Sequence, residues 1–434
     1  MNVTSNSGTL ADFDPRDDSL FGKGTVDAVF SRLRESDRLA VDSNGAVPIY
    51  SLVRYTDVAR AYKEPDVFSP SAGLSLDSFD PAQSESLSRM LETAPPERHG
   101  ELRSAMQGAF REPNLSRLTT TTAELLDRFL ADSVGGGAVD FIEAFARVAS
   151  LKMMAELLGV TRSEEVRLGA LFRAAGEIGG GACSLSGDAR QATEFRLLRD
   201  LTRVVRAHRE EEGPGGLIGR LLGVRIAREP LTDHEVALNC LNVVIAGTGT
   251  SQHALAGAAA VWAQRPAELE RVDDDPGLAP GLIDETLRWL TPVVHLTRIV
   301  TRDVEVSGSQ LPRGAGVCLW NISANRDEEV FEEAHAFRPD RPTRRHLAFG
   351  AGPQHCLGAQ IVRMQLDALL TGLLASGVRF ELDGDPTWIR SNTITGVERL
   401  PLLVRRVDGE STTKGDCETH DRGGHDGRTQ PPTG

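Results

Sequence analysis

The chain has 434 residues, with 62 acidic and 48 basic side chains and a net charge of −14 at pH 7. This acidic balance disfavours binding to nucleic acid or to anionic membranes, so a small molecule or another protein is the expected partner. Residues 1–24 are polar without an apolar core, which excludes a signal peptide or membrane anchor and predicts a cytoplasmic protein.

The composition predicts one large domain, because no linker rich in Pro, Gly or Ser divides the chain into two halves. We place this domain at 25–406, after a flexible N-terminal segment 1–24 and before a disordered polar tail 407–434. The five cysteines are scattered without a CxxC pair, so no disulfide framework is expected.

In chain order, the first expected elements are a strand within 48–53 and a helix that starts at Tyr55. Apolar residues at helical spacing then predict a series of longer helices, and alternation with Gly and Pro predicts strands near the C-terminus. The helices are expected at 116–132, 139–158, 192–212, 233–264 and 282–290, and the strands at 304–306 and 316–322. The predicted fold class is mainly α with small β-sheets, and the glycine-rich segment 176–187 is a candidate lid.

The long predicted helix 233–264 contains Ala246-Gly247-Thr248-Gly249-Thr250. Glycine inside a helix costs about 1 kcal/mol relative to alanine, so two of them need a compensating role. Close packing of a second helix is the simplest such role, and a catalytic opening of the helix is the alternative.

A second motif, Phe349-Gly350-Ala351-Gly352-Pro353-Gln354-His355-Cys356-Leu357-Gly358, precedes an amphipathic helix that begins near Ala359. Glycines allow backbone turns that other residues avoid, and a cysteine beside a helix N-terminus is stabilised as a thiolate that can bind a metal. The alternatives are a buried apolar cysteine or a nucleophilic pair with His355, although neighbouring residues at a helix start point in different directions.

This decapeptide resembles the haem-binding loop of cytochrome P450 enzymes, Phe-Gly-x-Gly-x-His-x-Cys-x-Gly, and departs from it at Gln354. The resemblance implies the P450 fold, with haem b between a long central helix and the helix after the cysteine loop. It implies that the Cys356 thiolate is the axial ligand of the iron. It also implies that Phe349, Gly350 and Gly358 belong to the cofactor-binding loop and that Gln354 donates a hydrogen bond towards a haem propionate.

Other segments support this resemblance. His99 and Arg103, spaced i,i+4 after Ala94-Pro95-Pro96, fall where bacterial members of the family place ligands of the haem propionates, and Arg298 resembles a third. Glu285 and Arg288 on a predicted helix, with Arg341, resemble the buried ion-pair set of the family.

The segment Ala246 to Thr250 resembles the catalytic part of the central helix, where the family has an acid before a threonine. Thr250 matches and implies a hydroxyl that steers protons onto bound oxygen, whereas Gly249 replaces the acid. The resemblance therefore implies a catalytic group of Ala246, Gly249 and Thr250 that lacks the usual carboxylate.

The implied function is oxidation of a medium-sized, largely apolar or aromatic small molecule by activated O2, in bacterial secondary metabolism. A monooxygenase is expected, oxidative coupling or cyclisation is the alternative reaction, and a non-catalytic haem-binding protein is the alternative class. Electrons would come from NAD(P)H through a ferredoxin-type donor and its reductase, with Arg344, Arg345 and Arg363 as a basic docking patch. Substrate contacts are expected from 69–91, 176–187, Asn242, Ala246, 293–296 and 392–396.

Overall fold

The structure is a computed structural model that describes residues 13–21, 25–83, 87–179, 187–210, 215–342 and 345–407. Helices make up most of these residues. They are α1 (Thr25–Glu35), α2 (Tyr55–Lys63), α4 (Pro96–Gln107), α5 (Asn114–Ser133), α6 (Arg147–Leu158), α7 (Arg162–Gly179), α8 (Gly187–Glu210), α9 (Gly216–Leu222), α10 (Asp233–Ala263), α11 (Pro266–Asp274), α12 (Ala279–Leu290), α13 (Asn321–Ala324) and α14 (Ala359–Ala375).

The strands form one five-stranded sheet and several smaller ones. The large sheet has the order β1 (Ala40–Asp42), β2 (Ile49–Leu52), β10 (Gly316–Trp320), β7 (His295–Val300) and β3 (Phe68–Ser69), in which β10 pairs parallel with β2 and antiparallel with β7. A second sheet has the order β11 (Val378–Leu382), β14 (Pro401–Arg406) and β4 (Val139–Asp140). Three two-stranded pairs are β5 (Arg225–Ile226) with β6 (Glu229–Pro230), β8 (Val304–Val306) with β9 (Ser309–Leu311), and β12 (Thr387–Trp388) with β13 (Val397–Arg399).

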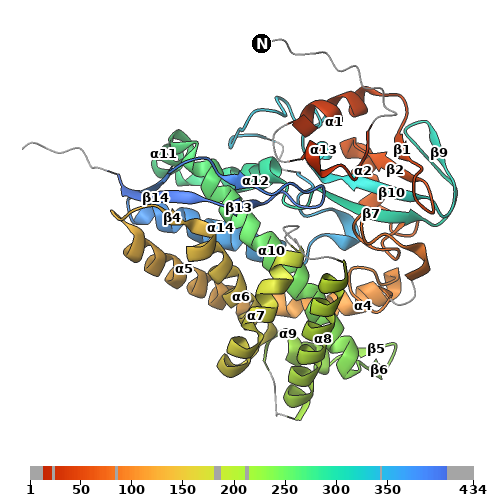
Figure 1. Cartoon of the computed structure of the whole chain (residues 1–434), viewed down its shortest axis with the longest axis horizontal. Coiled ribbons are helices and arrows are strands. Elements are labelled where there is room, and N and C mark those ends of the chain that lie inside the picture. Colours follow the sequence, from red (N-terminus) through yellow and green to blue (C-terminus); the bar gives the residue numbers. More distant parts are fainter. Residues whose placement is uncertain are drawn as a thin grey trace, which may run out of the picture.

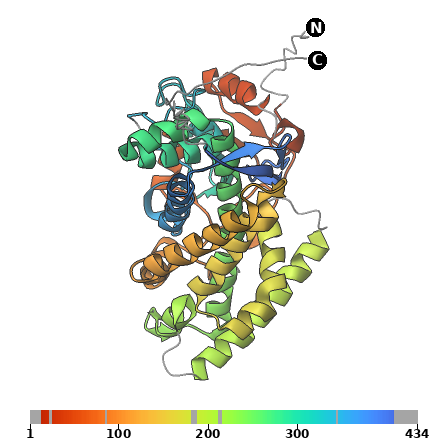
Figure 2. The same cartoon turned by 90° about the vertical axis from the view of Figure 1, so that its left-hand side faces the viewer.

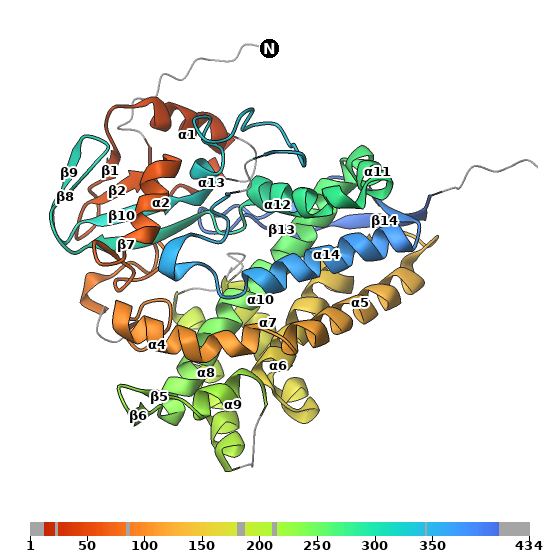
Figure 3. The ribbon, with the colours of Figure 1, turned by 180° about the vertical axis from the view of Figure 1, so that it is seen from behind.

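Helix α10 is central and crosses most of the molecule, while the five-stranded sheet lies at one end beside α1 and α2 (Figure 1). The helices from α5 to α9 gather in the half away from that sheet (Figure 2). On the back of the molecule α14 lies beside α5, and the segment before α14 leads from the sheet region towards α10 (Figure 3). The cysteine-loop helix and the central helix are therefore neighbours, as the sequence predicts.

The first turn of α10 is fixed by a capping box. The Thr232 hydroxyl accepts a hydrogen bond from the Glu235 backbone N–H at 3.2 Å, and the Glu235 carboxylate accepts one from the Thr232 backbone N–H at 3.0 Å. Glu235 also forms an ion pair with Arg98 of α4 at 2.9 Å. One carboxylate thus joins the start of the central helix to the first turn of α4.

Most predicted elements are confirmed, with corrections at their ends. Residues 139–140 are not helical as predicted, because they form β4 and pair with Leu402 and Pro401 of β14, and a π-helical turn at 142–146 follows. The predicted strand 316–322 ends at Trp320, where α13 begins. The candidate lid 176–187 starts inside α7 and ends at the first residue of α8, and residues 180–186 lie outside the described residues.

The folded part of the chain begins before residue 25. Phe21 is 3% exposed and stacks on Trp320 with ring centroids 5.8 Å apart, and the Asn392 side chain donates to the Pro15 carbonyl at 2.9 Å. Of the predicted tail 407–434, Val407 is described and its N–H donates to the Gly377 carbonyl at 2.8 Å. Residues 408–434 lie outside the described residues, as do residues 1–12. None of the helices that the structure describes is both long and apolar enough to cross a bilayer.

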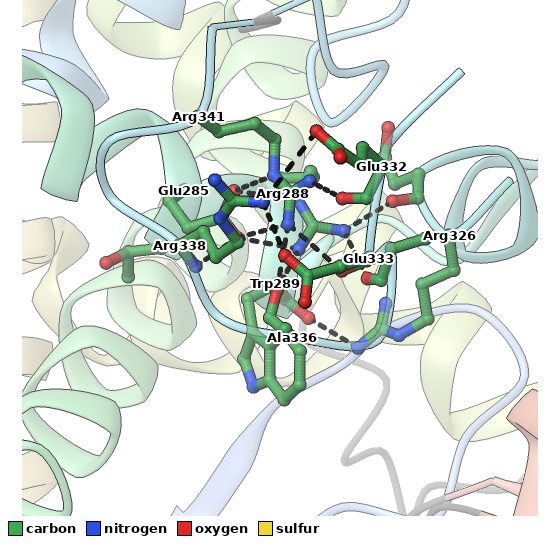
Figure 4. A network of polar contacts seen from close by, with 12 residues as sticks. Glu285, Arg288, Trp289, Arg326, Glu332, Glu333, Ala336, Arg338 and Arg341 are labelled. Atoms are coloured by element: carbon green, nitrogen blue, oxygen red, sulfur yellow. Dashed lines mark hydrogen bonds and ion pairs between the residues drawn. The ribbon is translucent and has the colours of Figure 1, made fainter. Parts of the chain in front are cut away.

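The predicted set Glu285, Arg288 and Arg341 is confirmed as a buried ion-pair network, and each of the three is at most 4% exposed. Glu285 accepts two hydrogen bonds from Arg288 at 2.7 and 2.8 Å and two from Arg341 at 3.3 and 3.4 Å (Figure 4). Both guanidiniums also donate to the carbonyl of Ala336, at 3.1 and 2.9 Å. These bonds tie α12 to the loop 334–341 that leads towards the cysteine loop.

Candidate active site

The cysteine loop is closed by its own backbone. The Cys356 N–H donates to the Phe349 carbonyl at 2.9 Å, and the His355 N–H donates to the Gly352 carbonyl at 3.1 Å. Among the described cysteines, Cys240 and Cys318 are buried while Cys356 is exposed. The loop therefore presents the Cys356 thiol just before α14, where it can reach a ligand.

Two glycines of the loop have left-handed backbone conformations, as the sequence predicts. Gly350 has φ +65° and Gly352 has φ +66°. A Cβ on Gly352 would lie 2.8 Å from the Tyr62 carbonyl oxygen and 3.0 Å from the Lys63 Cα, and a Cβ on Gly350 would lie 3.2 Å from the Tyr62 ring. The glycines thus serve two purposes, because they form the turn and let the loop pack on α2.

Gly352→Ala is expected to destabilise the fold more than Gly377→Ala and to reduce the haem content of the purified protein. Both glycines have positive φ, which costs an alanine about 1 kcal/mol, but a Cβ on Gly377 would meet nothing within 4 Å. The clash with α2 should add about 1 to 3 kcal/mol. Urea unfolding and haem absorbance measure both effects, and equal values for the two variants would contradict a packing role of Gly352.

The electrostatic surroundings of Cys356 favour metal ligation over nucleophilic catalysis. Although Cys356 has an exposed side, the protein atoms around its sulfur desolvate it, and this desolvation raises the pKa of the thiol. The charge of Glu92 raises the pKa further, while the backbone N–H groups of Gly358 and Ala359 and the charge of Arg103 lower it. A nucleophilic cysteine needs a lowered pKa, whereas a bound metal cation itself deprotonates a coordinating thiol. The raised pKa of the Cys356 thiol therefore fits a metal ligand and not a nucleophile.

The three predicted cofactor ligands come from α4 and β7. His99 is buried and Arg103 lies four residues later on the same face of α4. Burial and the nearby Arg103 lower the pKa of His99. Arg298 is 3% exposed, lies over the Tyr62 ring at 5.5 Å and donates to the Thr297 carbonyl at 2.6 Å.

Gln354 lies beside Arg298, and its side-chain oxygen accepts a hydrogen bond from the guanidinium at 3.4 Å. Within the described part of the chain, neither Arg103 nor Arg298 forms an ion pair with a carboxylate, although the protein has more acidic than basic residues. Buried cations without a carboxylate partner are costly, so a bound anion is expected to stabilise them. Two propionates beside a metal held by a thiolate meet this requirement, and the residues present fit haem.

The face of α10 that carries the predicted catalytic residues is partly accessible. Asn242, Ala246 and Thr250 follow one another at i,i+4 spacing and are half-buried, whereas Thr248 and Gly249 are buried. The Thr250 hydroxyl donates to the Ala246 carbonyl at 2.6 Å. Helix α10 is assigned as one unbroken α-helix from Asp233 to Ala263, so the opening implied by the family is not seen in this structure.

The glycines of α10 allow close helix packing. A Cβ on Gly247 would lie 2.5 Å from the Cε of Met154 on α6, and α7 approaches α10 so closely that a Cβ on its Gly176 would lie 3.0 Å from the Thr248 methyl carbon. Gly247 thus contacts the end of the Met154 side chain, which agrees with the packing interpretation. No acidic residue takes the place of Gly249 in α10 itself.

Sequence reasoning missed one polar residue of the site, Glu92. Its carboxylate accepts a hydrogen bond from Asn242 of α10 at 2.9 Å. Burial raises the pKa of Glu92, and Asn242 and Arg298 lower it. The only signal in the sequence is an acidic residue in the short stretch before Pro95-Pro96, and nothing there indicates its partner 150 residues away.

Comparison with known proteins places these features in a family. The family model described as cytochrome P450 matches residues 278–394. The steroid C26-monooxygenase of Mycobacterium tuberculosis is 28% identical over 398 residues, which cover 90% of this chain and 97% of that protein. The methyl-branched lipid omega-hydroxylase of Mycobacterium bovis is 27% identical over 365 residues, which cover 81% of this chain and 83% of that protein.

Solved structures of cytochrome P450 proteins are also similar to this chain. P450 OxyD, involved in the biosynthesis of vancomycin-type antibiotics, has a TM-score of 0.80 and 26% identity, with 91% of this chain and 100% of that chain covered. The Mycobacterium marinum cytochrome P450 CYP268A2, solved with pseudoionone, has a TM-score of 0.79 at 21% identity, with 91% and 98% covered, and so shares the fold.

The mainly helical fold, the central helix and these likenesses define a haem-thiolate oxidoreductase. The chain belongs to the cytochrome P450 family and is a P450 monooxygenase.

Proposed function

We propose that Cys356 is the axial thiolate ligand of haem b and that His99, Arg103 and Arg298 hold the haem propionates. The observation that carries this proposal is one exposed thiol in the cysteine loop together with two arginines, from α4 and β7, that form no ion pair with a carboxylate among the described residues. Phe349, Gly350 and Gly358 shape the loop around the cysteine, and a Cβ on Gly358 would lie 3.9 Å from the Cys356 sulfur. Gln354 acts through Arg298, whose guanidinium it contacts.

When bound, the haem supplies reductive activation of dioxygen, with the thiolate donating electron density to the iron. Thr250 holds a hydroxyl proton at Oγ1, which is donated to the Ala246 carbonyl and would be available to a ligand that offers a better acceptor. With Gly249 in place of an acid, Thr250 is the only proton-bearing side chain of the predicted catalytic group. The substrate is a medium-sized, largely apolar or aromatic small molecule of bacterial secondary metabolism, oxidised by hydroxylation or epoxidation.

Electrons are proposed to come from NAD(P)H through a ferredoxin-type partner and its reductase. Arg345 is exposed near the cysteine loop and is available for docking. Arg363 contributes less, because it donates to Asp284 at 3.1 Å and lies over the Phe349 ring at 4.7 Å. Arg344 lies outside the described residues.

Thr250→Ala tests this assignment of roles. With a surrogate ferredoxin and reductase and a substrate found by screening, the share of NAD(P)H recovered as oxygenated product is expected to fall about tenfold, with hydrogen peroxide released instead. Product mass is the direct readout, since hydroxylation adds one oxygen and oxidative coupling removes hydrogen.

Thr248→Ala is the matched control, because the Thr248 hydroxyl makes the same bond to the carbonyl four residues earlier, also at 2.6 Å, but is buried. Its yield should stay within about twofold of the wild type. Equal losses in the two variants would mean that the threonines act only through helix stability. A product that has lost hydrogen and gained no oxygen would overturn the monooxygenase assignment.

A further inference from the structure

Glu92 is held in one position by the central helix. Asn239 of α10 accepts a hydrogen bond from the Leu91 N–H at 2.9 Å and donates to the Arg89 carbonyl at 3.1 Å. Asn242, one turn later, donates to the Glu92 carboxylate at 2.9 Å. Two asparagines thus clamp the segment 89–92 along α10, and the carboxylate does not move freely as a surface side chain would.

The carboxylate lies beside the half-buried stripe of α10 that carries the predicted catalytic residues. Its hydrogen-bond partner Asn242 belongs to the same stripe as Ala246 and Thr250. The charge of Glu92 also interacts with that of Arg298 on β7. Glu92 is therefore adjacent to residues from both sides of the proposed site.

Glu92 has no cationic partner in hydrogen-bond contact within the described part of the chain, and Asn242 is its one hydrogen-bond donor there. If Arg298, Arg103 and His99 bind the propionates, no protein cation of the site remains to neutralise it. A partly buried carboxylate without a cation in contact is costly, so its charge is best explained by a ligand that brings a positive group.

A role in proton delivery fits the geometry less well. Asn242 precedes Thr250 by eight residues, which is about 12 Å along a helix axis. Because Glu92 contacts Asn242 and not the helix turn of Thr250, no hydrogen bond among the described residues connects it to the Thr250 hydroxyl. The carboxylate is placed to orient a substrate and not to replace the acid missing at Gly249.

We propose that Glu92, positioned by Asn242, binds the ammonium group of a substrate that is otherwise apolar or aromatic. This inference rests on the proposed function and narrows its substrate class to amines. The positive charge of the ammonium group is attracted to the carboxylate, while the half-buried stripe of α10 contacts the rest of the molecule.

The test compares phenylalkyl trimethylammonium ions, with chains of two to four carbons, with their neutral tert-butyl isosteres. A quaternary nitrogen has no lone pair, so these probes cannot ligate iron and they report charge alone. Calorimetric titration of the wild-type holoenzyme is expected to show about tenfold tighter binding of at least one cation than of its isostere. Equal affinities throughout the series, or no binding of any cation, would overturn the proposal.

Glu92→Gln is expected to lose this preference while binding the neutral isostere within about twofold of the wild type. Glu92→Asp keeps the charge and should retain part of the preference, which guards against a folding defect of the glutamine variant. Glu97→Gln, an exposed glutamate in the first turn of α4, is the matched control and should behave as wild type. A preference that survives in Glu92→Gln would assign the cation site elsewhere and contradict the proposal.

Haem content and the spectrum of the reduced, carbon monoxide-bound protein are recorded on the same samples. If the wild type lacks a thiolate-ligated haem, the proposed function fails. A wild type that shows the thiolate-ligated haem but binds cation and isostere equally contradicts the amine proposal alone, so the two failures are distinguishable.

Discussion

Cys356→Ser is expected to abolish the red-shifted Soret band that a thiolate-ligated haem gives when reduced under carbon monoxide. A serine hydroxyl does not supply the thiolate that donates electron density to the iron. Turnover should fall by more than about a hundredfold, which is the upper range for residues that merely support a metal ligand. Optical spectra of the purified variant, with haem quantified separately, are the measurement.

Cys240→Ala is the control for this substitution. Cys240 is buried in α10, and burial raises the pKa of its thiol to about 12, so it does not form a thiolate under assay conditions. The band should persist in this variant at wild-type intensity per haem. A band that survives in Cys356→Ser would refute Cys356 as the ligand.

Glu285→Ala is expected to lower the free energy of unfolding by about 3 to 5 kcal/mol, because it leaves Arg288 and Arg341 buried without their shared carboxylate. This is a large share of the about 5 to 15 kcal/mol that stabilises a typical protein. Haem retention should fall as well, since the network anchors the loop that leads to the cysteine. Urea unfolding followed by circular dichroism measures the change.

The comparison variant is Glu268→Ala on α11. Glu268 accepts a hydrogen bond from the exposed Arg271 at 2.8 Å, and loss of an exposed pair should cost about 0 to 1 kcal/mol. If the free energies of unfolding of Glu285→Ala and Glu268→Ala differ by less than about 1 kcal/mol, the buried network stabilises the fold no more than an exposed ion pair does. If Glu285→Ala does not fold, the free energy of unfolding is measured on Glu285→Gln instead.

Elements with a strong local signal were predicted well from the sequence. Helices α5 and α10 match their predicted ranges within two residues, because both carry apolar residues at helical spacing over several turns. The failures involve pairing between distant segments. Val139 joins a strand only because Leu402 lies opposite, and β7 is buried on both faces, so it lacks the alternation that marks a half-buried strand.

The residues of the candidate site also differ in whether a local sequence pattern predicts them. The cysteine loop is predictable because its glycines, its cysteine and the following helix are contiguous, and the left-handed conformations at Gly350 and Gly352 confirm the reasoning about turns. Glu92 was missed because its significance depends on Asn242, 150 residues away, and on charges from β7 and the cysteine loop. Neither relation leaves a local pattern in the sequence.

The carboxylate of Glu235 links the starts of two helices. It caps α10 through Thr232 and forms an ion pair with Arg98, the neighbour of His99, so one side chain holds the beginnings of α10 and α4 together. Separating these two helices would require breaking the cap and the ion pair at the same time. If His99 holds a propionate as proposed, the same carboxylate also restricts the movement of that ligand.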